Sequence, residues 1–101
     1  MHASIRKYQI DTDSVAALKV RVEDGFVPLI SKLPGFVSYM VVDAGDGAVA
    51  SISIFESEEA AEQSNAAAAQ WVKESLADVI KRPPEITAGA IVLAAPTPPA
   101  W

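Results

Sequence analysis

Short runs of apolar, β-branched and aromatic residues mark the strand-like stretches of this chain. The first covers residues 3–10, and the second covers 36–55 around the loop DAGDG, whose two glycines suit the positive backbone angles of a hairpin turn. The third is EITAGAIVLA, residues 85–94. Because the hairpin contributes two strands, the pattern predicts four strands in all.

Between the first strand and the hairpin, apolar residues recur every three or four positions, as on one face of a helix. Asp13 is expected to cap the start of this helix with its side-chain oxygen. Gly25 and Pro28 interrupt it, because proline has no amide hydrogen to offer the carbonyl of Asp24, so a kink or a second short helix is expected. The predicted apolar face consists of Val15, Leu18, Val22, Phe26 and Leu29.

A second helix is predicted to begin after Ser57, whose hydroxyl suits an N-cap and is followed by two glutamates near the positive end of the helix. Lys81 and Arg82 are expected to close the helix beside its carbonyl end, before two prolines stop it. The predicted apolar stripe consists of Ala61, Ala68, Val72, Leu76 and Val79.

The resulting order, β-α-β-β-α-β, predicts an α+β fold of the ferredoxin-like type. Its four-stranded antiparallel sheet carries both helices on one face. With 101 residues, half of them hydrophobic, the chain suits one domain, assigned to residues 1–95. Residues 96–101 form a Pro-rich tail that is expected to be extended.

Both faces of the hairpin are predicted to be apolar, although two helices cover only one. A soluble protein rarely leaves such a patch exposed, so we expect a homodimer in which a second copy packs sheet to sheet and closes a shared barrel. Ser51 and Ser53 stand out as polar positions that mark either a pocket or a half-wet surface. The alternating sets are Phe36, Ser38, Met40 and Val42 against Val37, Tyr39 and Val41, and Ala48, Ala50, Ile52 and Ile54 against Val49, Ser51, Ser53 and Phe55.

Composition narrows the classes of function. The chain holds 8 Lys plus Arg against 13 Asp plus Glu, a formal net charge of -5, which gives no basic footprint for nucleic acid or an anionic membrane. The strand AVASISIF also lacks the basic residues of an RNA-recognition domain. There is no cysteine and no long apolar stretch, so thiolate metal sites are excluded, no membrane span is predicted, and a cytoplasmic location is expected.

LPGFVSYMVVD, the hairpin and FESEEAAEQS together resemble the antibiotic-biosynthesis-monooxygenase-like group of the dimeric α+β barrel superfamily. Members often show PGF before the second strand and an aromatic-x-Ser-x-Glu-Ala run into the second helix. The resemblance implies a homodimeric barrel with a ligand cavity between sheet and helices in each subunit. It also implies a small aromatic or polyketide-like ligand, because the group includes cofactor-free oxygenases of aromatic polyketides.

The chain also departs from the pattern of this group. Phe55 stands where tryptophan is common, and Ser64 stands where many members carry a histidine, so both positions are candidate ligand contacts by resemblance. Trp71 on the second helix resembles a tryptophan of the haem-degrading branch. That branch also uses a helix histidine as iron ligand, whereas the one histidine here is His2, so haem degradation is not expected.

Four residues are candidates for catalysis by a cofactor-free oxygenase: Arg6, Tyr8, Tyr39 and Asn65. Such an enzyme needs groups that help to deprotonate a phenol or hydroquinone and that stabilise the resulting anion. Each residue also has an ordinary structural interpretation: packing for the tyrosines, a solvated or interface charge for Arg6, and a structural hydrogen bond for Asn65. Trp71 could stack on an aromatic ligand or simply pack.

Two functions stay open at this point. One is a cofactor-independent monooxygenase acting on a small aromatic or polyketide-like substrate. The alternative is a non-catalytic dimeric protein that binds a small ligand or serves as a scaffold. No metal site is predicted, because Asp43 and Asp46 are turn residues and a cation site normally needs three or more spaced oxygen ligands.

Overall fold

Within residues 1–95, which the computed structural model describes, the strands form one antiparallel sheet in the order β2-β3-β1-β4. This is the strand order expected of the ferredoxin-like fold, and the predicted fold class is confirmed. The strands are β1 (His2–Gln9), β2 (Phe36–Gly45), β3 (Ala48–Phe55) and β4 (Glu85–Ala90).

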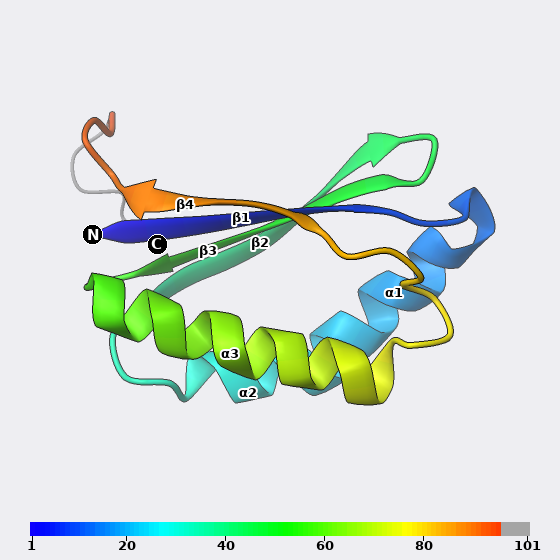
Figure 1. Cartoon of the computed structure of the whole chain (residues 1–101), viewed down its shortest axis with the longest axis horizontal. Helices are drawn as coiled ribbons and strands as arrows, with labels where there is room; N and C mark the ends of the chain where they lie inside the picture. The colour runs from blue at the N-terminus through cyan, green and yellow to red at the C-terminus, as the bar shows by residue number, and fades with distance from the viewer. Residues whose placement is uncertain (96–101) are drawn as a thin grey trace.

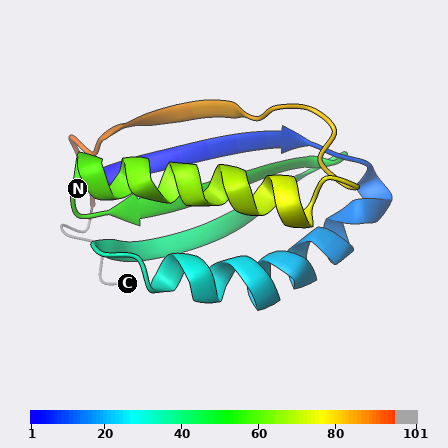
Figure 2. The ribbon, with the colours of Figure 1, turned by 60° about the horizontal axis from the view of Figure 1, so that its bottom comes forward.

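The helices lie together on one face of the sheet, and the opposite face carries none in this part of the chain (Figures 1 and 2). In Figure 2, α3 crosses one half of the sheet while the segment from α1 to α2 runs under the other half. The helical elements are η1 (Thr12–Ser14), α1 (Val15–Arg21), η2 (Val22–Phe26), α2 (Val27–Ser31) and α3 (Glu58–Ser75).

The interruption predicted at Gly25 and Pro28 is present as a π-helical turn, η2. In it the amide of Val27 donates to the carbonyl of Val22, five residues earlier, instead of four. The wide turn accommodates Pro28 and changes the phase of the apolar face. As a result Ile30 is 1% exposed, whereas Leu29, predicted to be in the apolar face, is 37% exposed. The prediction for Leu29 is therefore wrong by one position.

The cap predictions had different outcomes. Ser57 caps α3, since its hydroxyl accepts the amide hydrogen of Ala60 at 3.1 Å. Asp13 does not cap α1, because it already lies inside the 3-10 turn η1, and neither that turn nor α1 has a side-chain cap. An N-cap residue stands just before the first helical turn and has non-helical backbone angles, so a residue inside a helical turn cannot serve as the cap.

The second helix and the last strand both end earlier than predicted. Leu76 leaves helical geometry (φ -125°, ψ 16°), is 1% exposed, and accepts the amide hydrogens of Val79 and Ile80. This turn places Val79 and Ile80 against the core, and Lys81 and Arg82 consequently follow the helix instead of ending it. β4 ends at Ala90, and the amide of the next residue donates to the carbonyl of Met1.

A bulge at the start of β2 corrects one predicted face of the hairpin. The register shifts between Phe36 and Ser38, so Phe36 pairs with Phe55 and packs edge-on against it, 5.7 Å between ring centroids. Phe36 therefore joins the helix-covered core and not the face of Met40 and Val42. An extra residue in one strand has this effect because it reverses the side to which the neighbouring side chain points.

The face of the sheet without helices is rich in apolar side chains, as the alternation predicted. Cross-strand pairing places Ile5 opposite Ile52, and Ile52 opposite Met40. Val42 on the same face is 44% exposed. In residues 1–95 no helix is long and apolar enough to cross a membrane.

Candidate functional site

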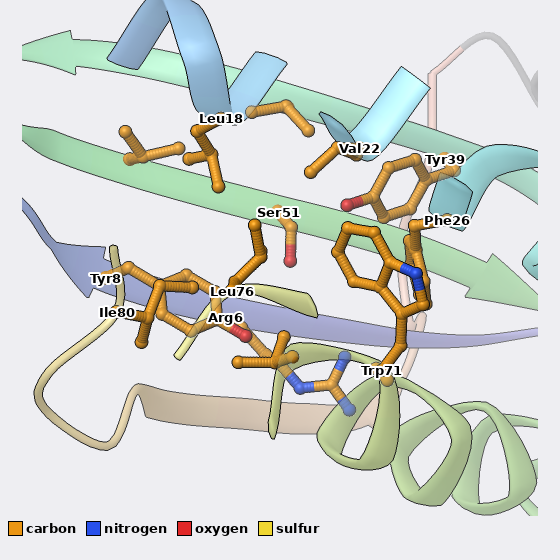
Figure 3. Close-up of a pocket in the computed structure, with 14 residues that line it drawn as sticks. Arg6, Tyr8, Leu18, Val22, Phe26, Tyr39, Ser51, Trp71, Leu76 and Ile80 are labelled. Atoms are coloured by element: carbon orange, nitrogen blue, oxygen red, sulfur yellow. The ribbon is translucent and has the colours of Figure 1, made fainter. Parts of the chain in front are cut away.

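A small cavity lies between the helix-covered face of the sheet and the helices (Figure 3). Its volume is about 30 Å³, which is enough for about two water molecules. The lining is mostly apolar, with polar groups from β1, β2 and β3 pointing into it. It consists of Arg6, Tyr8, Leu18, Val22, Phe26, Tyr39, Val41, Val49, Ser51, Ala68, Trp71, Val72, Leu76 and Ile80.

Arg6 is the charged group of this cavity. It is 4% exposed, and its Nη2 donates to Oδ1 of Asn65 on α3 at 2.6 Å. Among the described residues no carboxylate forms an ion pair with it. Burial lowers the pKa of Arg6, and the nearby hydroxyls of Tyr8 and Tyr39 oppose that shift only in part. The site therefore holds a buried cation whose side-chain partner is a neutral amide.

The two tyrosines stand on either side of β3, on the neighbouring strands β1 and β2. Burial raises the pKa of Tyr8, and Arg6 opposes this shift. Burial also raises the pKa of Tyr39 to about 12, although a hydrogen bond with Ser51 opposes the shift. Both phenols consequently stay protonated near neutral pH and act as hydrogen-bond donors, not as bases.

Trp71 projects from α3 toward the π-helical turn η2. Its ring packs on Phe26 with 5.3 Å between centroids, and Phe26 in turn meets the ring of Tyr39 edge-on, also at 5.3 Å (Figure 3). Gly25 leaves the space that the indole occupies, because a Cβ there would lie 3.0 Å from Cζ2 of Trp71. Trp71 thus both packs and lines the cavity.

The structure brings together most of the residues singled out in the sequence, with two exceptions. Arg6, Tyr8, Tyr39 and Trp71 line the cavity, and Asn65 joins them through its hydrogen bond to Arg6. Phe55 is 0% exposed and packs on Phe36, and the buried hydroxyl of Ser64 donates to the carbonyl of Ala61. These two side chains do not line the cavity, so the ligand-contact role inferred for them from the resemblance has no geometric support.

Two of the surface grooves on the described residues each share four lining residues with the cavity. One lies between α1 and the β2–β3 hairpin, with a volume of about 620 Å³, and shares Leu18, Val22, Val41 and Val49 with the cavity. The other, which we call the α3–β4 groove, has a volume of about 370 Å³. It shares Arg6, Tyr8, Val72 and Ile80 with the cavity.

Sequence reasoning missed the contribution of the first helix to this site. Leu18, Val22 and Phe26 were predicted only as core, yet all three also line the cavity. The combination of Gly25 with Pro28 was the local signal, because a wide helical turn often marks a functional site. The α3–β4 groove was missed as well, although the sequence KRPP at residues 81–84 forms part of its wall.

The residues weighed as metal ligands do not form a cluster. His2 lies at the start of β1 and Asp46 lies in the hairpin turn. Asp43, expected in the turn, lies in β2, where its Oδ1 accepts the amide hydrogen of Gly45 at 2.9 Å. Within the part of the chain that the structure describes, no three His, Cys, Asp or Glu side chains come together as a candidate metal site.

Solved structures of the same fold match nearly the whole chain. A protein of unknown function from Nitrosomonas europaea has a TM-score of 0.76 at 18% identity, over 92% of this chain and 90% of that one. The monooxygenase ActVA-Orf6 of Streptomyces coelicolor, solved with nanaomycin D, has a TM-score of 0.69 at 23% identity, over 92% of each chain. SnoaB from Streptomyces nogalater, a cofactor-independent oxygenase, has a TM-score of 0.73 at 13% identity, over 94% of this chain and 96% of that one.

At these identities the likeness shows a shared fold, and it confirms at that level the resemblance seen in the sequence. No protein-family model matches the chain, and no curated protein matches it.

Proposed function

We propose that this chain is an antibiotic-biosynthesis-monooxygenase-like enzyme that oxygenates a small phenolic aromatic without a cofactor. The observation that carries the proposal is the buried Arg6, which has no carboxylate partner among the described residues. Burying a cation without an opposite charge costs free energy, and an anion in the cavity would recover part of it. A phenolate formed from the substrate would supply that anion.

The cavity favours formation of the phenolate by stabilising it. Arg6 would lower the pKa of a phenol placed beside it, and the protonated hydroxyls of Tyr8 and Tyr39 would donate hydrogen bonds to the developing anion. None of the described residues that line the cavity carries a carboxylate or an imidazole, so the substrate proton passes to water. Asn65 holds the guanidinium in place and acts as a positioning residue.

The phenolate is electron-rich and can react with dioxygen directly. For 1-naphthol the overall step gives 1,4-naphthoquinone and water. One oxygen atom of dioxygen bonds to the ring carbon opposite the hydroxyl, and the other leaves as water with two hydrogens from the substrate. The substrate supplies all four electrons, so the reaction needs no external reductant.

Room for the substrate comes from the α3–β4 groove, because a cavity of about 30 Å³ holds water but not an aromatic ring. In this arrangement the ring occupies the groove, whose wall includes Tyr8, and the phenolic oxygen reaches the guanidinium of Arg6 at the point shared by groove and cavity. Trp71 closes the far side of the cavity.

Dioxygen consumption with a panel of phenols and hydroquinones, including 1-naphthol, tests the proposal. Labelled dioxygen should place one oxygen atom in the quinone, with one dioxygen consumed per phenol and no peroxide formed. A monooxygenase of the same fold serves as the positive control. A complete lack of turnover across the panel would contradict the proposed reaction.

Variants at Arg6 test the role of the charge. Arg6→Gln should lower kcat about 100- to 1000-fold and move the rise of the pH-rate profile to higher pH, because the phenol loses the cation that lowers its pKa. Arg6→Lys should keep part of the activity. Arg21→Gln removes an exposed arginine that pairs with Asp78 and is the matched control. Equal activity of Arg6→Gln and Arg21→Gln would refute the assignment.

The same proposal includes a homodimer that covers the open face of the sheet. Ile5, Ile52 and Met40 form an apolar patch there, and a second copy related by a twofold axis would bury it. Native mass spectrometry should show a dimer, and Ile52→Glu should convert it to monomer. A stable monomer of the unaltered chain would show that another explanation of this face is needed.

A non-catalytic ligand-binding or scaffold protein is the second candidate. It is favoured by the tyrosines with raised pKa values and by the lack of an acid or imidazole in the cavity lining, since neither feature provides a base. A small molecule retained in native mass spectra, without dioxygen consumption in the presence of any phenol, would support this candidate over the oxygenase.

A further inference from the structure

The α3–β4 groove gathers positive charge in an acidic protein. Four of the eight Lys and Arg residues of the chain line it, namely Arg6, Lys73, Lys81 and Arg82, and none of its lining residues is acidic. Among the described residues, the recorded ion pair is Arg21 with Asp78, and neither residue lines this groove. The hydrogen bond from Arg21 lowers the pKa of Asp78 and the charge of Lys81 adds to this shift, but in residues 1–95 none of the four cations forms an ion pair inside the groove. A local excess of cations on a chain of net charge -5 needs a physical reason.

Apart from the polar groups of Tyr8 and Asn65, the remainder of the groove wall is apolar, and two prolines stiffen it. Pro83 and Pro84 follow directly after Lys81 and Arg82, and each proline ring fixes the backbone φ angle and so limits the motion of this connection. Ile80 and Ile86 add apolar surface on either side of the prolines. A groove with apolar walls and a cluster of cations fits a ligand that has an apolar ring system and an anionic group.

We propose that the α3–β4 groove binds the carboxylate of an aromatic substrate, with Lys81 and Arg82 as the anchoring cations. The proposal rests on the oxygenase function and names its substrate class as a phenol that carries a carboxylate on its ring system or on a short side chain. Arg6 lies deepest in the groove and faces the cavity, so it meets the phenolic oxygen, whereas the exposed cations at residues 81 and 82 meet the carboxylate.

The charge cluster also has a consequence for salt dependence. Lys81 and Arg82 are exposed, so their attraction to a carboxylate is screened by added salt, whereas contacts with the apolar wall are not. Binding of a carboxylated ligand should therefore weaken as salt is raised, and binding of its neutral counterpart should change little.

A pair of matched probes tests this inference without turnover. Isothermal titration calorimetry of the full chain under anaerobic conditions would compare 5-hydroxy-1-naphthoate with 1-naphthol, which differ by a carboxylate on the ring remote from the hydroxyl. We expect the carboxylated probe to bind at least about tenfold tighter at low salt, with the difference shrinking at high salt. The double variant K81Q/R82Q should weaken it about three- to thirtyfold while leaving 1-naphthol unaffected.

The control is K19Q/K32Q, which removes the same charge from exposed positions outside this groove. An equal loss in both double variants, equal affinity for the two probes, or no binding of either probe would overturn the inference. Its failure is distinguishable from failure of the oxygenase function. Turnover of 1-naphthol without preferential binding of the carboxylated probe would refute the carboxylate site in the groove and leave the oxygenase function standing. Selective binding of the naphthoate without turnover would refute the oxygenase function and leave the carboxylate site standing.

Discussion

Replacing Gly25 by alanine tests whether the π-helical turn is shaped by the indole of Trp71. A Cβ on residue 25 would lie 3.0 Å from Cζ2 and 3.2 Å from Nε1 of Trp71, closer than ordinary van der Waals contact. The indole also packs on Phe26, so it must be displaced from that ring or the helix must move outward. Gly25 does not have a positive φ angle, so its backbone would accept alanine without strain. The obstacle to the added Cβ is therefore the indole of Trp71.

Two effects of this substitution oppose each other. Alanine in place of a helical glycine stabilises a protein by about 0.5–1 kcal/mol, because glycine loses more backbone freedom on folding. Overpacking costs about 1–3 kcal/mol in a well-packed core, and because the indole of Trp71 is only half-buried the cost here stays below the upper value. We therefore expect Gly25→Ala to lower the free energy of unfolding by roughly 0.5–2 kcal/mol, where each kcal/mol corresponds to about 4–8 °C in Tm for a domain of this size.

A double-mutant cycle with Trp71→Phe separates the two effects. Phenylalanine is smaller than the indole, so in that background the clash is relieved and Gly25→Ala should become stabilising. Thermal and urea unfolding measure both values, and Trp71 fluorescence in a Trp101→Phe background reports whether the indole has moved. If Gly25→Ala stabilises both backgrounds equally and leaves the fluorescence unchanged, the proposed contact does not shape the turn.

Two further predictions concern the tyrosines and the cap of α3. Burial raises the pKa of both tyrosines in the chain, that of Tyr39 to about 12, so the near-ultraviolet absorbance of the folded protein should show little tyrosinate at pH ~10, the ordinary midpoint. Because the folded-state pKa of Tyr39 is raised, its contribution to the free energy of unfolding is fully present below pH ~10 and is lost as the pH rises toward about 12. A tyrosine titration of the folded protein with its midpoint at the ordinary value would contradict this prediction. Ser57→Ala should lower the free energy of unfolding measured in urea by about 1 kcal/mol, since it removes the acceptor for the amide of Ala60. The control Ser64→Ala on the same helix should change it by less than about 0.5 kcal/mol, because the Ser64 hydroxyl bonds only the carbonyl of Ala61. Equal costs at the two serines would argue against Ser57 as a cap.

The fold was predictable because each of its elements has a local signal. The hairpin glycines, the cap at Ser57 and the helical periodicity around Leu18 and Val22 depend on residues a few positions apart. Two of the errors arose where one residue changes the phase of an element. The π-helical turn moved the buried position from Leu29 to Ile30, and the bulge after Phe36 moved that ring to the other side of the sheet. A periodic pattern assumes a regular helix or strand, so it does not reveal a single residue inserted by a π-helical turn or a β-bulge.

The candidate site was predictable only where one strand carried the information. Arg6 and Tyr8 are two positions apart, so alternation alone places them on one face of β1. Asn65 is 59 positions from Arg6, and no local pattern could pair them. Resemblance was a weaker guide than burial, since Phe55 and Ser64 were inferred as ligand contacts, whereas the structure places both in the packed interior.

Asn65 is the recorded side-chain partner of the buried Arg6, and the pair indicates what the site lacks. The half-buried amide of Asn65 accepts one hydrogen bond from the guanidinium. A guanidinium carries five N–H donors, and in residues 1–95 its recorded side-chain bond uses one of them. Stability alone would favour an apolar residue at position 6, because a buried charge paired only with an amide is costly. The cost of burying Arg6 is offset if the cavity binds an anion during its function. The Arg6→Gln variant should therefore fold at least as well as the unaltered chain and still lose activity.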